Sequence, residues 1–107
     1  EGGIGNDYLY GDSGQDTIYG NDGNDWLQGN GGKDKLYGGI GDDHLWGGND
    51  SIGILLYGDQ LWGGSGNDTF YKNVGLSSIA DKIKDVQSGD KVKWGVWPWG
   101  PWTNPLV

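Results

Sequence analysis

The sequence repeats a nine-residue pattern five times without a gap between residues 2 and 46. The units read GGIGNDYLY, GDSGQDTIY, GNDGNDWLQ, GNGGKDKLY and GGIGDDHLW. One unit of this length cannot bury an apolar face alone, so a strict repeat predicts an array in which neighbouring units stack. The period therefore restricts the chain to a solenoid.

The eighth position of each unit holds a large aliphatic residue: Leu9, Ile18, Leu27, Leu36 and Leu45. Three residues that alternate out, in and out form a very short strand whose middle side chain points inward. The other six residues must form a turn. Two units then make one coil of 18 residues with a turn on each edge, so that each turn stacks on the turn two units away.

The turns have the composition of a cation site. Glycines at the first and fourth positions supply positive φ and bare backbone carbonyls, and Asp at the sixth position adds a carboxylate. Oxygen ligands without imidazole or thiolate favour calcium. We expect three well-formed Ca²⁺ sites between stacked turns, at 7/25, 25/43 and 16/34. The expected ligands are Asp7, Asp16, Asp25, Asp34, Asp43, Asp50 and Asp68, with the turns of Gly5, Gly14, Gly23, Gly32 and Gly41.

The pattern G-G-x-G-x-D-x-U-x, over residues 2–71, resembles the nonapeptide repeat of the RTX family. The resemblance implies a right-handed parallel β-roll, calcium in the turns and export by a type I secretion system. It places the protein outside a bacterial cell, secreted or at the cell surface.

Composition excludes several other classes. The chain has 107 residues, 24 of them Gly, with a net charge of −8 and no Cys. A strongly acidic chain with scattered lysines is a poor partner for nucleic acid, and no apolar run is long enough to span a bilayer. Ordering a Gly-rich chain costs more free energy than its few inward side chains return, so we expect the array to need cations to fold.

The period slips between residues 47 and 62. Asp43, Asp50, Asp59 and Asp68 are spaced by 7, 9 and 9, and the apolar residues Leu45, Ile52, Leu61 and Phe70 have the same spacing. These spacings predict an array that loses two residues once and continues in register. The calcium sites expected at the Asp pairs 43/59 and 34/50 would then each include an irregular turn. The Asp pair 50/68 is a further candidate calcium site.

The irregular stretch includes the apolar run Ile54, Leu55, Leu56 and Tyr57 in place of a GGxGx turn. Bulky and β-branched residues disfavour positive φ. One interpretation is an eroded repeat whose apolar residues fold under the roll. The other is a contact surface for a second copy or another protein.

After residue 71 the nine-residue period ends. The stretch ADKIKDVQSGDKVKW (80–94) has two alternating segments around a Gln-Ser-Gly-Asp turn, which predicts a capping β-hairpin within residues 72–95. It is similar to the D-x-I-x-D-F-x-x-G-x-D-K-I segment that follows the β-roll of serralysin-type proteases, with Val86 in place of Phe and one residue fewer before Asp90.

The C-terminal segment 96–107 is rich in Trp and Pro, and Pro excludes a regular helix there. Trp97, Trp99 and Trp102 could pack on the end of the roll, contact another subunit or stack on sugar rings. These alternatives stay open.

No catalytic set is present in the sequence: the one His, His44, has no Ser or Cys partner motif. The sequence predicts an all-β chain with a roll over 1–71, irregular at 47–62. The leading functional hypothesis is a non-catalytic extracellular calcium-binding module that folds after secretion. Alternatives are a self-assembling filament or surface-layer subunit and a carbohydrate-binding adhesin module.

Overall fold

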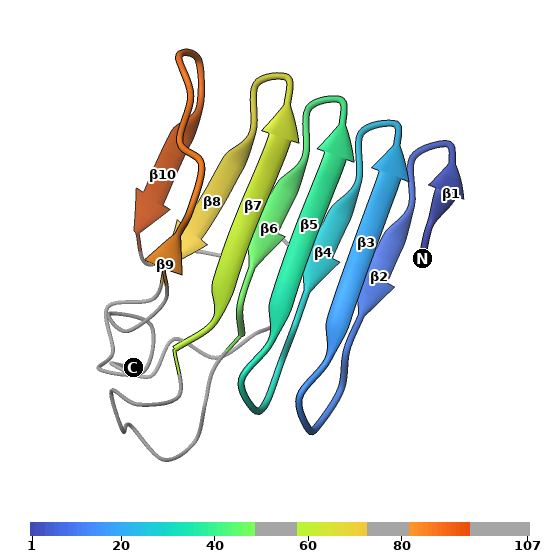
Figure 1. Ribbon diagram of the computed structural model, residues 1–107, viewed down its shortest axis with the longest axis vertical. Coiled ribbons are helices and arrows are strands. Elements are labelled where there is room, and N and C mark those ends of the chain that lie inside the picture. The colour runs from blue at the N-terminus through green and yellow to red at the C-terminus, as the bar shows by residue number, and fades with distance from the viewer. Residues whose placement is uncertain (49–57, 73–81, 95–107) are drawn as a thin grey trace.

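The computed structural model describes residues 1–48, 58–72 and 82–94. Every regular element in these ranges is a strand, and the ten strands form two sheets of five (Figure 1). No helix in the described ranges is long and apolar enough to cross a membrane. The candidate contact residues Ile54, Leu55, Leu56 and Tyr57, and Trp97, Trp99 and Trp102, lie outside the described ranges, so their role stays a prediction.

The first sheet has the strand order β1-β3-β5-β7-β9, and each neighbouring pair is parallel. Its strands are β1 (Gly3–Ile4), β3 (Thr17–Asp22), β5 (Lys35–Ile40), β7 (Gln60–Ser65) and β9 (Lys82–Ile83). The second sheet has the order β2-β4-β6-β8-β10 and is also parallel throughout. Its strands are β2 (Tyr8–Tyr10), β4 (Trp26–Gln28), β6 (His44–Trp46), β8 (Thr69–Lys72) and β10 (Lys91–Trp94).

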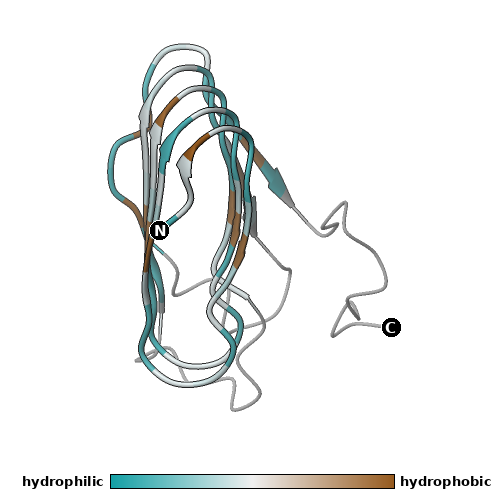
Figure 2. Ribbon diagram, turned by 90° about the vertical axis from the view of Figure 1, so that its right-hand side faces the viewer, coloured by the Kyte–Doolittle hydropathy of each residue, from teal (hydrophilic) through white to brown (hydrophobic). Residues whose placement is uncertain are grey.

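Consecutive strands alternate between the two sheets, so the chain winds as a flattened coil with one sheet on each side (Figure 2). This arrangement is a parallel β-roll, and the predicted all-β solenoid is confirmed. Parallel pairing follows from the repeat, because equal units that advance in one direction place equivalent residues beside each other. Leu9 pairs with Leu27, and Leu27 pairs with Leu45.

The core is one cluster of inward side chains that both sheets contribute. Its buried members are Ile18, Leu27, Leu36, Leu45, Leu61 and Phe70. Partly buried Leu9 and Ile83 pack against this cluster at its two ends. Each inward position comes from the eighth position of a unit or its equivalent, so the alternation in the sequence identifies the core.

The register across the irregular stretch differs from the prediction. β5 pairs with β7 through Leu36 and Leu61, and β6 pairs with β8 through Leu45 and Phe70, an advance of 25 residues. The predicted register advances only 16 residues here, from Leu36 to Ile52 and from Leu45 to Leu61. The predicted register beyond Leu45 is therefore wrong, as are the turn pairs 43/59, 34/50 and 50/68 derived from it. Ile52 itself lies outside the described residues.

Loop length explains the difference. The predicted register requires a turn of four residues, Gly47 to Asp50, where the repeat uses six. Instead, residues 47–59 connect β6 to β7, in the place where residues 29–34 connect β4 to β5. A doubled loop length costs only about 0.6 kcal/mol in closure entropy, whereas a turn that is too short cannot span the two sheets.

The predicted capping hairpin is also wrong. β9 and β10 lie in different sheets and do not pair with each other. β9 adds to β7 and β10 adds to β8, each in parallel and with an advance of 22 residues. The two segments form one more coil for a simple reason. The inward residues Leu61 of β7 and Phe70 of β8 are nine residues apart, and so are their partners Ile83 and Val92, so each new strand can pair in parallel with an exposed strand edge.

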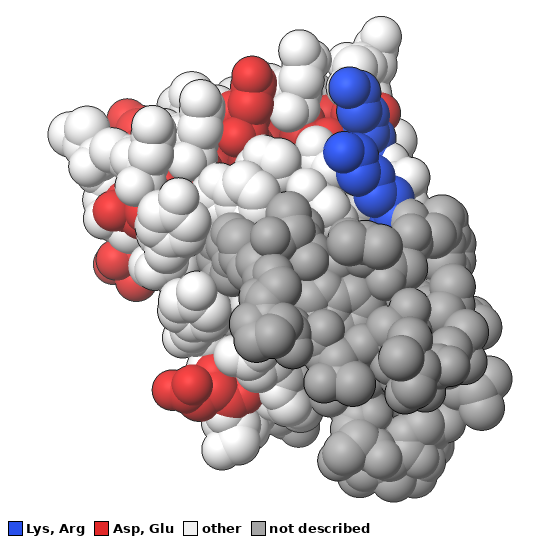
Figure 3. Space-filling model, turned by 180° about the vertical axis from the view of Figure 1, so that it is seen from behind, with Lys and Arg blue, Asp and Glu red and all other residues white. Residues whose placement is uncertain are grey.

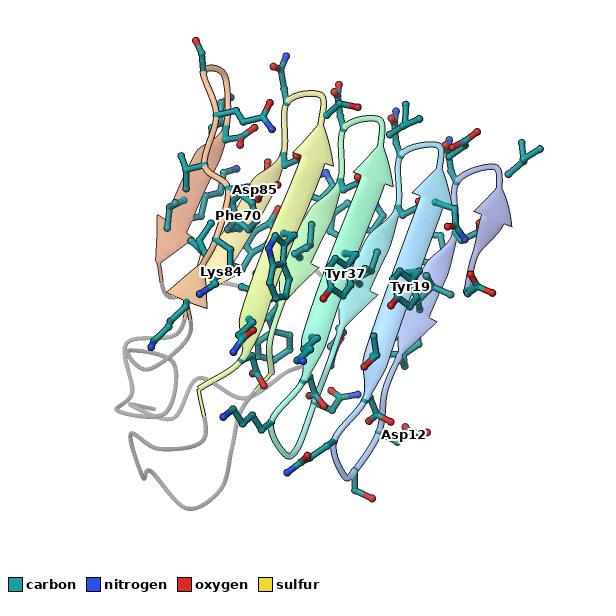
Figure 4. All side chains as sticks on the ribbon, viewed as in Figure 1. Asp12, Tyr19, Tyr37, Phe70, Lys84 and Asp85 are labelled. Atoms are coloured by element: carbon teal, nitrogen blue, oxygen red, sulfur yellow. The ribbon has the colours of Figure 1, made fainter. Side chains whose placement is uncertain are left out.

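Aromatic side chains form columns on the outer faces of both sheets. Tyr19 stacks on Tyr37, with ring centroids 4.9 Å apart, and Tyr37 stacks on Trp62 at 4.4 Å (Figure 4). On the other sheet, Trp26 stacks on His44 at 3.8 Å. Because both faces of the Tyr37 ring lie against other rings, this column stabilises the sheet and leaves mainly the ring edge toward solvent.

We expect Leu36→Ala to lower the free energy of unfolding in saturating calcium by about 2–5 kcal/mol, because a fully buried side chain would leave a cavity in the core. Leu9→Ala is the matched control in the first coil, where the side chain is only partly buried. It should lower stability less. Urea titrations followed by circular dichroism measure both values, and equal losses would contradict the described core.

Candidate functional site

The turns of the roll gather on two edges. Edge A, at the top of Figure 1, is formed by the turns 2–7, 20–25, 38–43, 63–68 and 85–90. Edge B, at the bottom, includes the turns 11–16 and 29–34 and the connection that ends at Asp59. Viewed from behind, the visible acidic side chains lie mainly around the rim of the molecule and the basic ones gather toward the β10 end (Figure 3).

A continuous ladder of aspartates connects the turns of edge A. The backbone N–H of each Asp donates to Oδ1 of the Asp in the following turn. The pairs are Asp7 to Asp25 at 2.8 Å, Asp25 to Asp43 at 2.8 Å, Asp43 to Asp68 at 2.9 Å and Asp68 to Asp90 at 2.9 Å. The ladder continues across the long connection on the opposite edge, so that connection does not interrupt edge A.

Edge B has the same kind of Asp ladder, with fewer turns in the described part of the chain. The N–H of Asp16 donates to Oδ1 of Asp34 at 2.9 Å, and the N–H of Asp34 donates to Oδ1 of Asp59 at 2.6 Å. Asp59 therefore takes the place in the third turn that the sequence analysis assigned to Asp50. Asp50 itself lies outside the described residues.

The second carboxylate oxygens are the unusual feature of these turns. Oδ2 is buried and has no hydrogen-bond partner in Asp7, Asp16, Asp25, Asp43 and Asp68. Burying an ionised oxygen without a partner is costly, and native proteins normally avoid it. Five equivalent atoms in this state fit turns that hold a positively charged ligand.

A backbone carbonyl accompanies each of these oxygens. A Cβ placed on Gly2 would lie 2.7 Å from Asp7 Oδ2 and 2.8 Å from the carbonyl oxygen of Gly20 in the next turn. The equivalent position on edge B, Gly11, has Asp16 Oδ2 at 2.8 Å and the Gly29 carbonyl oxygen at 2.7 Å. Only Gly leaves room for these oxygens to approach, which explains the first position of the repeat.

The fourth-position glycines have a different role. Gly5, Gly14, Gly23, Gly32 and Gly41 all have positive φ, between 98° and 126°. This left-handed region is strained for other residues, and it gives the turn its sharp bend. At Gly23, Gly32 and Gly41 a Cβ would also overlap the carbonyl of the fourth-position Gly in the preceding turn. The predicted glycine positions thus shape the turns, whereas their participation in metal binding stays a prediction.

Burial changes the acidity of the Asp ladder. It raises the pKa of Asp43 to about 7, against the lowering effect of the hydrogen bond from Asp25, and nearby Asp68 raises it further. Burial also raises the pKa of Asp68 to about 6, with a further contribution from Asp90. The pKa of Asp25 is raised for the same principal reason. Without a cation, these carboxylates resist ionisation.

The donor set fits a hard cation. The gap between two stacked turns offers two carboxylates and at least one glycine carbonyl, and all of these ligands are oxygens. Among the described residues, no group of three or more His, Cys, Asp or Glu side chains surrounds one point. A bound ion would therefore depend on backbone carbonyls as much as on side chains.

The structure brings most of the predicted ligand residues together in the Asp ladders, and it places two further Asp residues, Asp59 and Asp90, in the same ladders. Asp7, Asp16, Asp25, Asp34, Asp43 and Asp68 all lie in the ladders, in the predicted pairs 7/25, 25/43 and 16/34. Sequence reasoning did not select Asp59 and Asp90 as ligands. The signal was present, because Asp59-x-Leu61 and Asp90-x-Val92 repeat the Asp-x-apolar pattern of the regular units.

Comparison with known proteins gives a match to one family. The RTX calcium-binding nonapeptide repeat matches the chain in four copies, over residues 1–27, 19–51 and 57–71, which is more than half of its length. Searches of curated proteins and of solved structures return no match.

The raised pKa values predict how the calcium-free fold responds to pH. The folded state binds more protons than the unfolded chain between about pH 4, the ordinary range of Asp, and pH 7, where Asp43 titrates. The free energy of unfolding therefore falls as the pH rises through this window. We expect calcium-free protein to show more β-sheet circular dichroism at pH 5.5 than at pH 7.5.

The matched variants are Asp43→Asn and Asp42→Asn. Asp43→Asn should flatten part of the pH dependence, because it removes a buried titrating group. Asp42→Asn should retain it, because Asp42 is exposed on the same turn. A calcium-free signal that rises with pH would contradict the prediction.

Proposed function

The chain belongs to the RTX calcium-binding nonapeptide repeat family, and we propose that it is a non-catalytic extracellular module that folds when it binds calcium after export from a bacterial cell. The observation that carries the proposal is the set of buried, unpartnered Oδ2 atoms on the turns. A cation in each gap would compensate these charges, and its binding free energy would become folding free energy.

We place one ion in each of five gaps between turns of the matched repeats. Three gaps lie on edge A, between the Asp pairs 7/25, 25/43 and 43/68, and two lie on edge B, between 16/34 and 34/59. The three pairs derived from the regular repeats are among them. Asp25, Asp34 and Asp43 each border two of these gaps.

Calcium suits these gaps better than magnesium or zinc. Calcium accepts six to eight oxygens in flexible geometry, whereas magnesium requires a near-ideal octahedron and gives up its water reluctantly. Zinc prefers nitrogen and sulfur ligands, and none border the gaps. Extracellular calcium modules typically bind with dissociation constants of about 10⁻⁴–10⁻³ M, which would leave the chain calcium-free inside the cell and loaded outside.

The surroundings of His44 favour a structural role for this residue. Its Nδ1 lies 2.8 Å from the Tyr71 hydroxyl, and its ring stacks on Trp26. Burial lowers the pKa of His44, so its ring is neutral at neutral pH. A stacked, hydrogen-bonded imidazole supports the column on the sheet, and the Asp side chains are already occupied by the turn ladders.

Light scattering and far-UV circular dichroism, in chelator, in millimolar magnesium and in millimolar calcium, test the proposal. We expect an expanded, weakly structured monomer in chelator and in magnesium, and a compact β-rich monomer in calcium. A chain that is equally compact and structured in chelator at neutral pH would overturn calcium-dependent folding. Growth in mass on adding calcium would instead support the self-assembling alternative.

A single Asp substitution should lower calcium affinity more when the Asp borders two gaps than when it borders one. Asp25→Asn, which alters two gaps, should weaken the apparent affinity by at least about tenfold, the loss typical of a damaged metal-binding shell. Asp7→Asn, which alters one gap, should have a smaller effect. Calcium titrations followed by circular dichroism provide the midpoints.

Asp42→Asn is the control for these variants. Asp42 lies beside Asp43 but outside the Asp ladder, and its Oδ1 accepts the N–H of Asn67 at 2.8 Å. Asn24 makes the same contact with the N–H of Asp42 one coil earlier, so Asn fits this position. An equal loss of affinity in Asp25→Asn and Asp42→Asn would indicate that total charge, and not the gaps, governs binding.

A further inference from the structure

We propose that the last turn of the roll, residues 85–90, closes a calcium site against turn 63–68 although it lacks the nonapeptide motif. This inference rests on the proposed function, because it assumes that ions occupy the gaps between turns. It extends that function to a turn outside the matched repeats, which end at residue 71.

Turn 85–90 departs from the repeat in its sequence. It reads DVQSGD where turn 63–68 reads GGSGND, so Asp85 stands at the first position in place of Gly. The strands on either side of the turn nevertheless stack in register, since β9 and β10 pair with β7 and β8. Within the turn, the positive φ lies at Gly89, the fifth position, whereas turn 63–68 has it at Gly64 and Gly66. The N–H of Lys91 donates to the Asp68 carbonyl at 2.8 Å, as the equivalent N–H groups do in earlier coils.

Asp68 supplies the unsatisfied charge in this gap. Its side chain is fully buried, Oδ1 accepts the N–H of Asp43 at 2.9 Å, and Oδ2 has no hydrogen-bond partner. Oδ2 lies beside Gly63, at the position that Asp7 Oδ2 occupies beside Gly2 in the first turn. Beside Gly2, the same space also holds the Gly20 carbonyl oxygen of the following turn. We infer from this equivalence that Asp68 Oδ2 faces turn 85–90.

Two further carboxylates border the same gap. Asp90 Oδ1 accepts the N–H of Asp68 at 2.9 Å. Asp85, on the segment between β9 and β10 in Figure 4, accepts the N–H of Gly63 at 2.8 Å and that of Gly64 at 2.9 Å. Gly63 is therefore flanked by the carboxylates of Asp68 and Asp85. This gap concentrates more negative charge than a gap between two regular turns, which has two Asp side chains.

Hydrogen bonds hold the gap at a fixed width. Gln87 Nε2 donates to the Gly64 carbonyl at 2.7 Å, and the carboxylate of Asp85 accepts the N–H groups of Gly63 and Gly64. The two turns cannot separate to expose Asp68 Oδ2 to water without breaking these contacts. A divalent cation bound by oxygen ligands would neutralise the charge without such a rearrangement, and calcium tolerates the irregular ligand arrangement.

The test counts bound calcium ions by native mass spectrometry and equilibrium dialysis, on the full chain in saturating calcium. Asp7→Asn and Asp90→Asn form a matched pair, because each residue borders one gap at one end of edge A. We expect each variant to bind one ion fewer than the original chain. Asp42→Asn, on an exposed position of the same edge, should bind the full number.

The outcomes separate the two proposals. If Asp7→Asn loses one ion and Asp90→Asn loses none, the terminal site is wrong and ions in regular gaps remain supported. If neither variant loses an ion, the assignment of ions to gaps between turns fails and the terminal site fails with it. Loss of one ion in each variant, with the full number in Asp42→Asn, supports both.

A second variant applies if Asp90→Asn does not fold in calcium. Asp68→Asn removes the unpartnered oxygen itself and borders both the 43/68 gap and the 68/90 gap. With a terminal site, this variant should bind two ions fewer than the original chain. A loss of only one ion would overturn the terminal site.

Discussion

The whole fold depends on one carboxylate geometry, the Asp at the end of each turn with one oxygen bonded and the other buried without a partner. Oδ1 accepts the N–H of the preceding turn and fixes the distance between coils. Oδ2 is enclosed beside the first-position Gly, where it repels its equivalents in neighbouring turns. The same side chain therefore aligns the coils and destabilises them. A cation between the turns would convert the destabilising half of this arrangement into a favourable one, and the proposed coupling of stability to calcium binding rests on this change.

The two edges of the roll tolerate sequence change differently. On edge A, from β3 onward, the start of one strand and the start of the next are nine residues apart, from Gln60 to Thr69 as from Lys82 to Lys91. Edge B absorbs every change of length, through the connections 47–59 and 73–81. Because parallel pairing fixes only the strands, extra residues on one edge leave the Asp ladder of the other edge intact. The insertion therefore enlarges one loop and leaves the two sheets and edge A in register.

Much of this architecture could be predicted from the repeat alone. The period identifies the inward residues from Leu9 to Leu45, the Asp positions and the pairs 7/25, 25/43 and 16/34. The register beyond Leu45 could not be predicted, because Asp50-x-Ile52 imitates a unit and spacing alone does not reveal that a four-residue turn is too short. The predicted hairpin failed for a different reason. Alternation over Lys91–Trp94 indicates a strand but does not identify its partner, whereas the spacing of nine between Ile83 and Val92 indicates another coil. Ligand binding by the turns is a prediction that rests on the carboxylate and carbonyl oxygens gathered there.

The end of the roll follows from the same steric rule that governs its interior. In the regular turns a side chain at the first position is excluded, because its Cβ would meet both the Asp Oδ2 of its own turn and a carbonyl of the next turn. At turn 85–90, Asp90 directs Oδ2 to the N–H of Gln87 instead, and its own N–H donates to the Gln87 carbonyl at 3.1 Å. The N–H group that would bond a following coil is thereby used within the turn, and Oδ2 of Asp90, unlike that of Asp68, has a hydrogen-bond partner. The first position is then free to hold Asp85, whose carboxylate binds backward to Gly63 and Gly64. By the same steric rule, a side chain at that position would obstruct a regular turn stacked on it, and Asp85 instead anchors the last described turn to turn 63–68.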